Sequence, residues 1–172
     1  MNPNILSLLN KYADDHNKLQ LDCYVMSSVS NTLGFPGAST WFQIQAQDEV
    51  LHTRKIYNYL IGRDEILIVN PIQPEEHNEK SLLELMEKYL NYKLQFIEKT
   101  NTLIAACQET KDFLTIKFLD WFLIDFYEEI ELAKTYIDKI KMSNNNYYGI
   151  DKYLSKREEP DTLKVIVPYS VK

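Results

Sequence analysis

Glycine and proline are scarce in this chain, which has only 4 Gly and 6 Pro in 172 residues. Because turn-rich β folds depend on those residues, their scarcity and a hydrophobic content of 45% favour a single helical domain with a sizeable core. Cysteine is also rare. The two cysteines, Cys23 and Cys107, lie in apolar helical stretches, so we expect buried free thiols in a reducing compartment.

Other missing features argue against whole classes of protein. No apolar run is long enough to span a bilayer, so we expect no membrane partner. The N-terminal sequence MNPNILSLLNKYADD has neither the basic region nor the cleavage pattern of a signal peptide, which predicts a cytoplasmic location. A formal net charge of −6 and the lack of a Lys/Arg-rich arm argue against nucleic acid as a partner.

Apolar residues recur at spacings of three and four, which predicts four long helices and a short fifth one. The predicted helices cover about residues 5–33, 39–62, 81–107, 112–142 and 148–156. Short turns join the first helix to the second and the third to the fourth, whereas a long connection separates the second from the third. This order predicts an all-α four-helix bundle with one crossover, over residues 1–159, followed by a C-terminal tail at 160–172.

The long connection, residues 63–80, breaks the helical period. Its ILIV stretch, residues 66–69, could form a short strand or pack on a neighbouring subunit, and both alternatives stay open. His77 lies among glutamates in this connection, and we expect it to be a solvated loop histidine.

Polar groups interrupt the apolar seam of each long helix near its midpoint. These groups are His16 in the first helix, Glu49 and His52 in the second, Lys93 in the third, and Glu129 in the fourth, with Asp125 and Glu128 beside it. Burial of such groups is costly unless they are paired or bind a metal. Glu-x-x-His on an inward helical face is a feature of di-iron bundles, and carboxylates with imidazoles suit Fe(II). When the apolar seams of the four helices are aligned by their midpoints, these polar residues fall at the same height along the bundle. This alignment predicts that they form one shared site.

Three segments of the chain resemble the bacterial non-haem ferritins. AQDEVLH is similar to the family's A-Q-E-E-x-x-H, FLDWFLIDFYEEIEL to F-L-Q-W-x-x-x-E-Q-x-E-E-E, and YYGIDKYL to Y-x-I-D-K-x-L. The resemblance covers about residues 9–154. It implies a ferritin-like bundle that assembles with copies of itself into a hollow cage of about 24 subunits. It also implies an iron-storage protein without haem, whose cargo is Fe2+ oxidised to Fe3+.

The resemblance also assigns roles to positions, and several of them carry the wrong residue here. Glu49 falls on the carboxylate that bridges two irons, and His52 falls on the imidazole of the first iron. The first-helix glutamate is replaced by His16. The third-helix glutamate of the second iron is replaced by Lys93, and the fourth-helix glutamine is replaced by Phe126.

These replacements predict a degenerate ferroxidase centre. The ammonium of Lys93 repels a second iron, and we expect it to pair with Glu49 or Glu129 instead. Asp125, Glu128 and Glu129 keep acidic character where the family binds a further iron. Iron would then be stored with slow or absent oxidation by this chain, and no catalytic residue is assigned.

Two alternatives stay open. An active ferroxidase would use His16 in place of the missing carboxylate. A non-enzymatic structural cage would use the polar residues only as a salt-bridged core. A single divalent ion held by His16, Glu49 and His52 is compatible with the sequence, and zinc would suit the imidazoles as well as iron.

Overall fold

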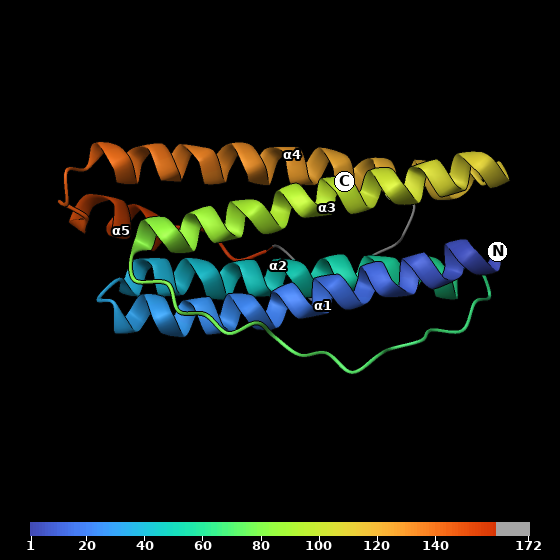
Figure 1. Ribbon diagram of the computed structural model, residues 1–172, viewed down its shortest axis with the longest axis horizontal. Helices are drawn as coiled ribbons and strands as arrows, with labels where there is room; N and C mark the ends of the chain where they lie inside the picture. The colour runs from blue at the N-terminus through green and yellow to red at the C-terminus, as the bar shows by residue number, and fades with distance from the viewer. Residues whose placement is uncertain (161–172) are drawn as a thin grey trace.

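The structure of the protein is a computed structural model that describes residues 1–160. All regular secondary structure in this part of the chain is α-helical, as predicted. The helices are α1 (Pro3–Thr32), α2 (Pro36–Ile61), α3 (Leu82–Thr110), α4 (Phe113–Met142) and α5 (Tyr148–Leu154). They form a four-helix bundle with a short fifth helix at one end, which confirms the predicted fold class (Figure 1). The predicted tail lies almost entirely outside the described residues.

Two antiparallel pairs, α1 with α2 and α3 with α4, make up the bundle (Figure 1). The crossover between α2 and α3 runs back along α1, so α2 and α3 point in the same direction. Aromatic, aliphatic and small side chains from all five helices form one continuous core. The candidate site lies midway along this core.

The start of the second helix and the end of the third differ from the predicted bounds for identifiable reasons. The second helix begins at Pro36 rather than at residue 39. Proline suits the first turn of a helix because its φ is already helical and because a backbone N–H would have no intrahelical acceptor there. The third helix continues to Thr110, after which Lys111 adopts a left-handed conformation with φ of 56°. Ser81 begins that helix as its N-cap and accepts a hydrogen bond from the Glu84 amide.

The short helix α5 is fixed to the beginning of α2. The carboxylate of Asp151 accepts hydrogen bonds from the amides of Gly37, at 3.0 Å, and Ala38, at 2.8 Å. These amides belong to the first turn of α2, where no intrahelical acceptor is available. A Cβ atom on Gly37 would lie 1.9 Å from the carbonyl oxygen of Asp151, so the close approach of the two helices requires glycine.

The crossover differs from the sequence-based expectations at residues 66–69 and at His77. Residues 66–69 form no strand, and Ile66, Ile68 and Val69 are exposed. His77 is not the solvated histidine that we expected, because its side chain is completely covered. The crossover lies against α1 there and brings His77 beside the buried carboxylate of Asp22.

The thiols of Cys23 and Cys107 are buried and free, as predicted. No helix within residues 1–160 combines the length and the apolar character needed to cross a membrane.

Candidate metal centre

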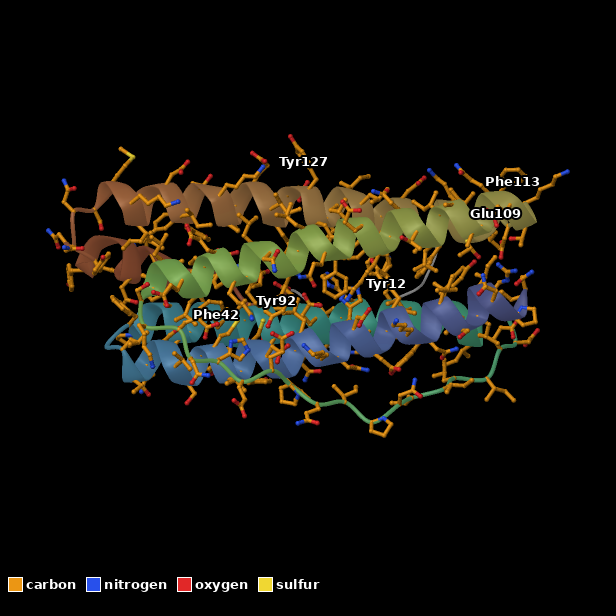
Figure 2. All side chains as sticks on the ribbon, in the orientation of Figure 1. Tyr12, Phe42, Tyr92, Glu109, Phe113 and Tyr127 are labelled. Carbon is orange, nitrogen blue, oxygen red and sulfur yellow. The ribbon has the colours of Figure 1, made fainter. Side chains whose placement is uncertain are left out.

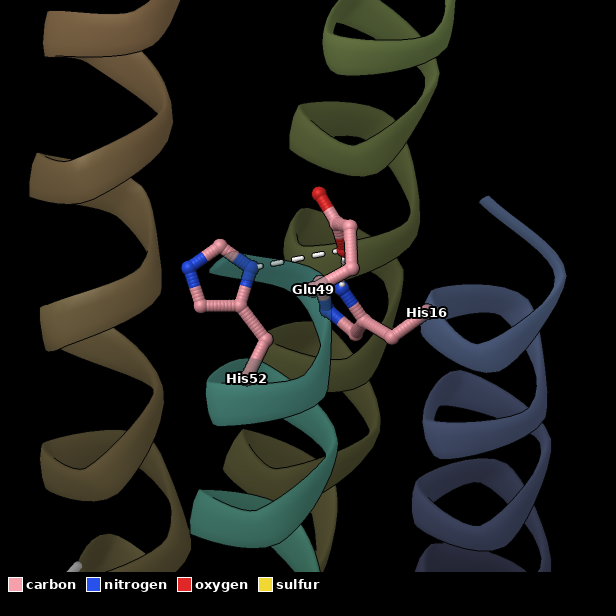
Figure 3. A group of neighbouring side chains, drawn as sticks. All are labelled: His16, Glu49 and His52. Carbon is pink, nitrogen blue, oxygen red and sulfur yellow. Dashed lines mark hydrogen bonds and ion pairs between the residues drawn. The ribbon is translucent and has the colours of Figure 1, made fainter. Parts of the chain in front are cut away.

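The polar residues that interrupt the apolar seams of the four long helices meet in the middle of the bundle. This is the level at which alignment of the seams by their midpoints predicted them. Nδ1 of His16 lies 2.5 Å from Oε2 of Glu49, which joins α1 to α2. The ammonium of Lys93 on α3 contacts Oε1 of Glu49 and lies 2.7 Å from Oε2 of Glu129 on α4. Figure 3 shows His16 and His52 on either side of the Glu49 carboxylate.

Glu49 is the residue to which the other groups are joined. Its side chain is fully buried, and it touches the imidazole of His16 and the ammonium of Lys93. Nδ1 of His52, one helical turn further along α2, lies 3.4 Å from Oε2. Burial raises the pKa of a carboxyl group, but the charges of Lys93, His52 and His16 hold the pKa of Glu49 well below its usual range. The protein's own side chains therefore keep this carboxylate ionised.

Lys93 is a buried cation that contacts two carboxylates at once. Its side chain has no exposed surface. Burial alone would lower its pKa, but Glu129 and Glu49 outweigh that effect and raise the pKa above its ordinary value. The ammonium also lies 5.5 Å from the centre of the Phe126 ring. Lys93 is therefore protonated and held in place at neutral pH.

His52 bridges two carboxylates. Its Nε2 lies 3.0 Å from Oδ2 of Asp125, while its Nδ1 faces Glu49. Burial acts to lower the pKa of this imidazole, but the charges of Glu49 and Asp125 raise it to about 10. At neutral pH His52 is an imidazolium, the second cation that the protein supplies to this centre.

His16 is neutral, in contrast to His52. Burial lowers its pKa to about 4 and outweighs the attraction of Glu49. Its ring stacks on Phe96 with 4.2 Å between centroids, and the edge of Tyr12 approaches it at 4.8 Å. The contact with Glu49 assigns the proton of the neutral ring to Nδ1, because a carboxylate can only accept.

Phe126 takes up space within the site. It is completely buried, and its ring lies nearly parallel to that of His16 at 5.8 Å. Together with Phe96 and Phe122 it surrounds His16 on the apolar side. Periodicity placed Phe122 and Phe126 on the apolar seam of the fourth helix, but it did not select Phe96 or indicate that the three rings enclose the histidine.

The remaining acidic groups lie at the edge of the centre. Asp125 is partly exposed and contacts His52, whereas Glu128 is an exposed side chain of α4. The carboxylate of Asp48 lies 3.3 Å from Nη2 of Arg157, beyond the end of α5. Sequence reasoning missed Arg157 because the two residues are 109 positions apart and no helical period relates them.

Three residues of the centre offer ligand atoms for a metal ion. Ligand atoms of His16, Glu49 and His52 all lie within 4.8 Å of one another, which is compatible with a single divalent ion once His52 has lost its second proton. The ammonium of Lys93 already contacts both Glu49 and Glu129, and three carboxylates of the centre face two protein cations.

Comparison with known proteins identifies the family. A model of the ferritin-like domain matches residues 6–143. A bacterial non-heme ferritin from Campylobacter jejuni is 33% identical over 133 residues, covering 75% of this chain and 79% of that protein. A probable bacterial non-heme ferritin-like protein from Haemophilus influenzae is 26% identical over 156 residues, covering 87% and 91%. The chain therefore belongs to the ferritin family, which confirms the resemblance noted in the sequence.

Solved structures support the same fold. A humanized archaeal ferritin superimposes with a TM-score of 0.90 at 21% identity, covering 94% of this chain and 99% of that one. An open-pore ferritin from Archaeoglobus fulgidus gives a TM-score of 0.89 at 21% identity, with coverage of 92% and 98%. At this level of identity the similarity establishes the architecture of the bundle.

Proposed function

We propose that this protein stores iron as a ferritin whose paired-iron oxidation centre has been replaced by an internal salt-bridge network. The observation that carries the proposal is the position of Lys93, whose ammonium contacts the carboxylates of Glu49 and Glu129. Membership in the ferritin family supports iron as the cargo. Copies of the chain would assemble into a hollow cage of about 24 subunits in the cytoplasm.

The energetics oppose a second iron at this site. Two unit charges about 4 Å apart interact by about 4 kcal/mol at an effective dielectric constant of about 20. Where a carboxylate would attract Fe2+ by that order, the ammonium of Lys93 repels it. Phe126 offers no ligand atom where the resemblance implies a glutamine. Two Fe2+ ions brought together would supply electrons to dioxygen, and Lys93 and Phe126 act against that step.

Storage would then rely on slower oxidation outside the centre. Asp48, Asp125, Glu128 and Glu129 are the acidic groups near it that can attract Fe2+. Arg157 holds the first of these, His52 faces Asp125, and Lys93 holds the last, which leaves Glu128 as the most accessible oxygen ligand. Fe3+ formed there would be retained in the cage.

Aerobic loading of the purified assembly with Fe2+ tests this proposal. We expect ferric absorbance to rise slowly in the wild type and faster in the double variant Lys93→Glu/Phe126→Gln, which restores both missing ligand types. Electron microscopy of loaded cages should show dense cores in both proteins. If the wild type oxidises iron as fast as the double variant, the centre is not degenerate. If no cores form, the structural-cage alternative is favoured over storage.

A second candidate function is binding of one divalent ion by His16, Glu49 and His52. Their ligand atoms are close enough to share an ion, and this favours a mononuclear site. Binding would release the second proton of His52, so affinity should increase with pH. Crystals soaked separately with Zn2+ and Fe2+ should show an anomalous peak beside His52, and its absence with both metals would exclude this candidate.

A further inference from the structure

A third histidine with a buried side chain, His77, lies outside the centre, on the crossover. The side chain of His77 is completely covered, although most of its neighbours in the connection are not buried. Its two ring nitrogens face carboxylates on opposite sides. Nε2 is 3.6 Å from Oδ1 of Asp22 on α1, and Nδ1 is 3.3 Å from Oε2 of Glu79. Neither nitrogen makes a hydrogen bond of good geometry to another described residue.

Charged and titratable groups from three elements lie next to this imidazole or pair with its neighbours. Asp22 of α1, Glu79 of the crossover and the ring of Tyr92 of α3 (labelled in Figure 2) lie next to it. Lys18 of α1, Glu75 of the crossover and Lys88 of α3 pair with these neighbours or with one another. The two lysines both bind Glu75, each at 2.9 Å, and Lys18 also binds Asp22. Asp22 and Glu75 therefore share the ammonium groups of Lys18 and Lys88, whereas Glu79 faces His77. These three carboxylates outnumber the two ammonium groups by one, so one positive charge on His77 would complete the balance.

Asp22 on α1 holds the crossover against the bundle through a hydrogen bond. It is buried on α1, and its Oδ1 accepts a hydrogen bond of 2.6 Å from the backbone amide of Glu75. Burial acts to raise the pKa of this carboxyl, but His77, Lys18 and the Glu75 amide lower it overall. The carboxylate of Asp22 is thus ionised and fixed beside the imidazole.

We propose that His77 is a proton-dependent clasp that holds the crossover against α1. An imidazolium can donate one N–H to Asp22 and the other to Glu79. A neutral imidazole has one N–H only, so its other nitrogen turns a lone pair toward a carboxylate. The clasp is therefore closed when His77 carries both protons and is weakened as the pH rises.

The segment held by this clasp borders a cavity of about 220 Å³ between α1 and α3. Glu75 and Tyr92 line it, and so do Leu19 and Phe96. Phe96 is the ring on which His16 of the metal centre stacks. Loosening the clasp would therefore expose a cavity that borders the aromatic shell of the centre.

A proton explains this geometry better than a metal ion. The two nitrogens of an imidazole point in opposite directions, so Asp22 and Glu79 cannot bind one ion together with His77. Within residues 1–160, the group able to offer three ligand atoms to a single ion is the one at the centre of the bundle.

Hydrogen exchange on the intact assembly, in the presence of EDTA, tests the clasp. The reporter is the peptide that contains the Glu75 amide. After correction for the chemical exchange rate, its protection should be about tenfold higher at about pH 5.5 than at about pH 8. His77→Gln should show low protection at both values. Asn78→Gln, a change at the exposed neighbouring position, should retain the wild-type difference.

Glu79→Gln provides a variant with the opposite expected effect. The amide of Gln can donate to the lone pair of a neutral His77, so the clasp should stay closed at about pH 8, with protection near the wild-type value at about pH 5.5. Wild-type protection that does not change with pH would overturn the proposal. A pH dependence that survives in His77→Gln would also overturn it, and so would a Glu79→Gln protein that is as unprotected as the wild type at the higher pH. Protection that is present without EDTA and abolished by EDTA at constant pH would likewise contradict it.

Discussion

Replacing Lys93 with methionine removes the cation from the centre while nearly conserving the length of the side chain. Glu49 would then be left with the imidazolium of His52, and Glu129 would lose the ammonium that lies 2.7 Å from it, in a site where both side chains are at most 10% exposed. Removal of one partner of a buried ion pair costs about 3–5 kcal/mol, because the other charge stays buried. For a chain of this size that loss lowers Tm by about 10 °C.

A matched control is available on the same helix. Lys99 pairs with Asp15 at 2.9 Å, but its side chain is 40% exposed, so Lys99→Met should cost at most about 1 kcal/mol. Thermal unfolding of the three assemblies, followed by circular dichroism at neutral pH, provides the comparison. Acidification should reduce the deficit of Lys93→Met, because protonation removes the charge of the unpaired carboxylates.

Divalent ions should restore part of the stability that Lys93→Met loses. An ion at about 100 times its Kd stabilises the folded state by about 2.7 kcal/mol. We expect Zn2+ to raise Tm more in the variant than in the wild type, where Lys93 occupies the carboxylates. Equal Tm values for wild type and Lys93→Met, or equal responses to Zn2+, would refute the view that Lys93 takes the place of a metal ion.

Three further outcomes are expected. The pKa of His52 rises from 6.5 to about 10 on folding, so the stability it contributes is full below about pH 6.5 and lost as the pH rises toward about 10. When Tm is measured against pH, the difference in Tm between wild type and His52→Gln should therefore disappear across that range. Asp151→Asn weakens the cap on α2 and should cost about 1 kcal/mol, seen as a Tm lower by about 2–4 °C. Lys93→Glu combined with Phe126→Gln should bind more Fe2+ per subunit than wild type in an equilibrium titration, and an unchanged number would argue against Lys93 and Phe126 as the blocking residues.

The helical period was sufficient to predict the bundle and the level at which its polar groups meet. His16, Glu49 and Lys93 each interrupt an apolar seam, and a seam that faces the core fixes where such a residue must lie. Midpoint alignment worked because the four helices are of similar length, between 26 and 30 residues. The sequence predicted that Lys93 would pair with Glu49 or Glu129 because of their opposite charges, and in the structure its ammonium contacts both.

Contacts made by irregular segments could not be predicted in the same way. The crossover has no periodicity, so nothing in the sequence placed His77 beside Asp22. Arg157 follows α5 and reaches Asp48 only because Asp151 anchors α5 to α2. Such contacts depend on the path of the backbone through space, which local spacing does not encode.

Anaerobic calorimetry of the metal-free assembly with Fe2+ tests the central claim most directly, because it counts the ions bound per subunit before any oxidation takes place. If Lys93 occupies the position of a second iron, no more than one tight ion should bind per subunit. Two tight ions per subunit would mean that Lys93 moves away from Glu49 and Glu129 when metal arrives, and would contradict the replacement of paired iron by an internal salt bridge.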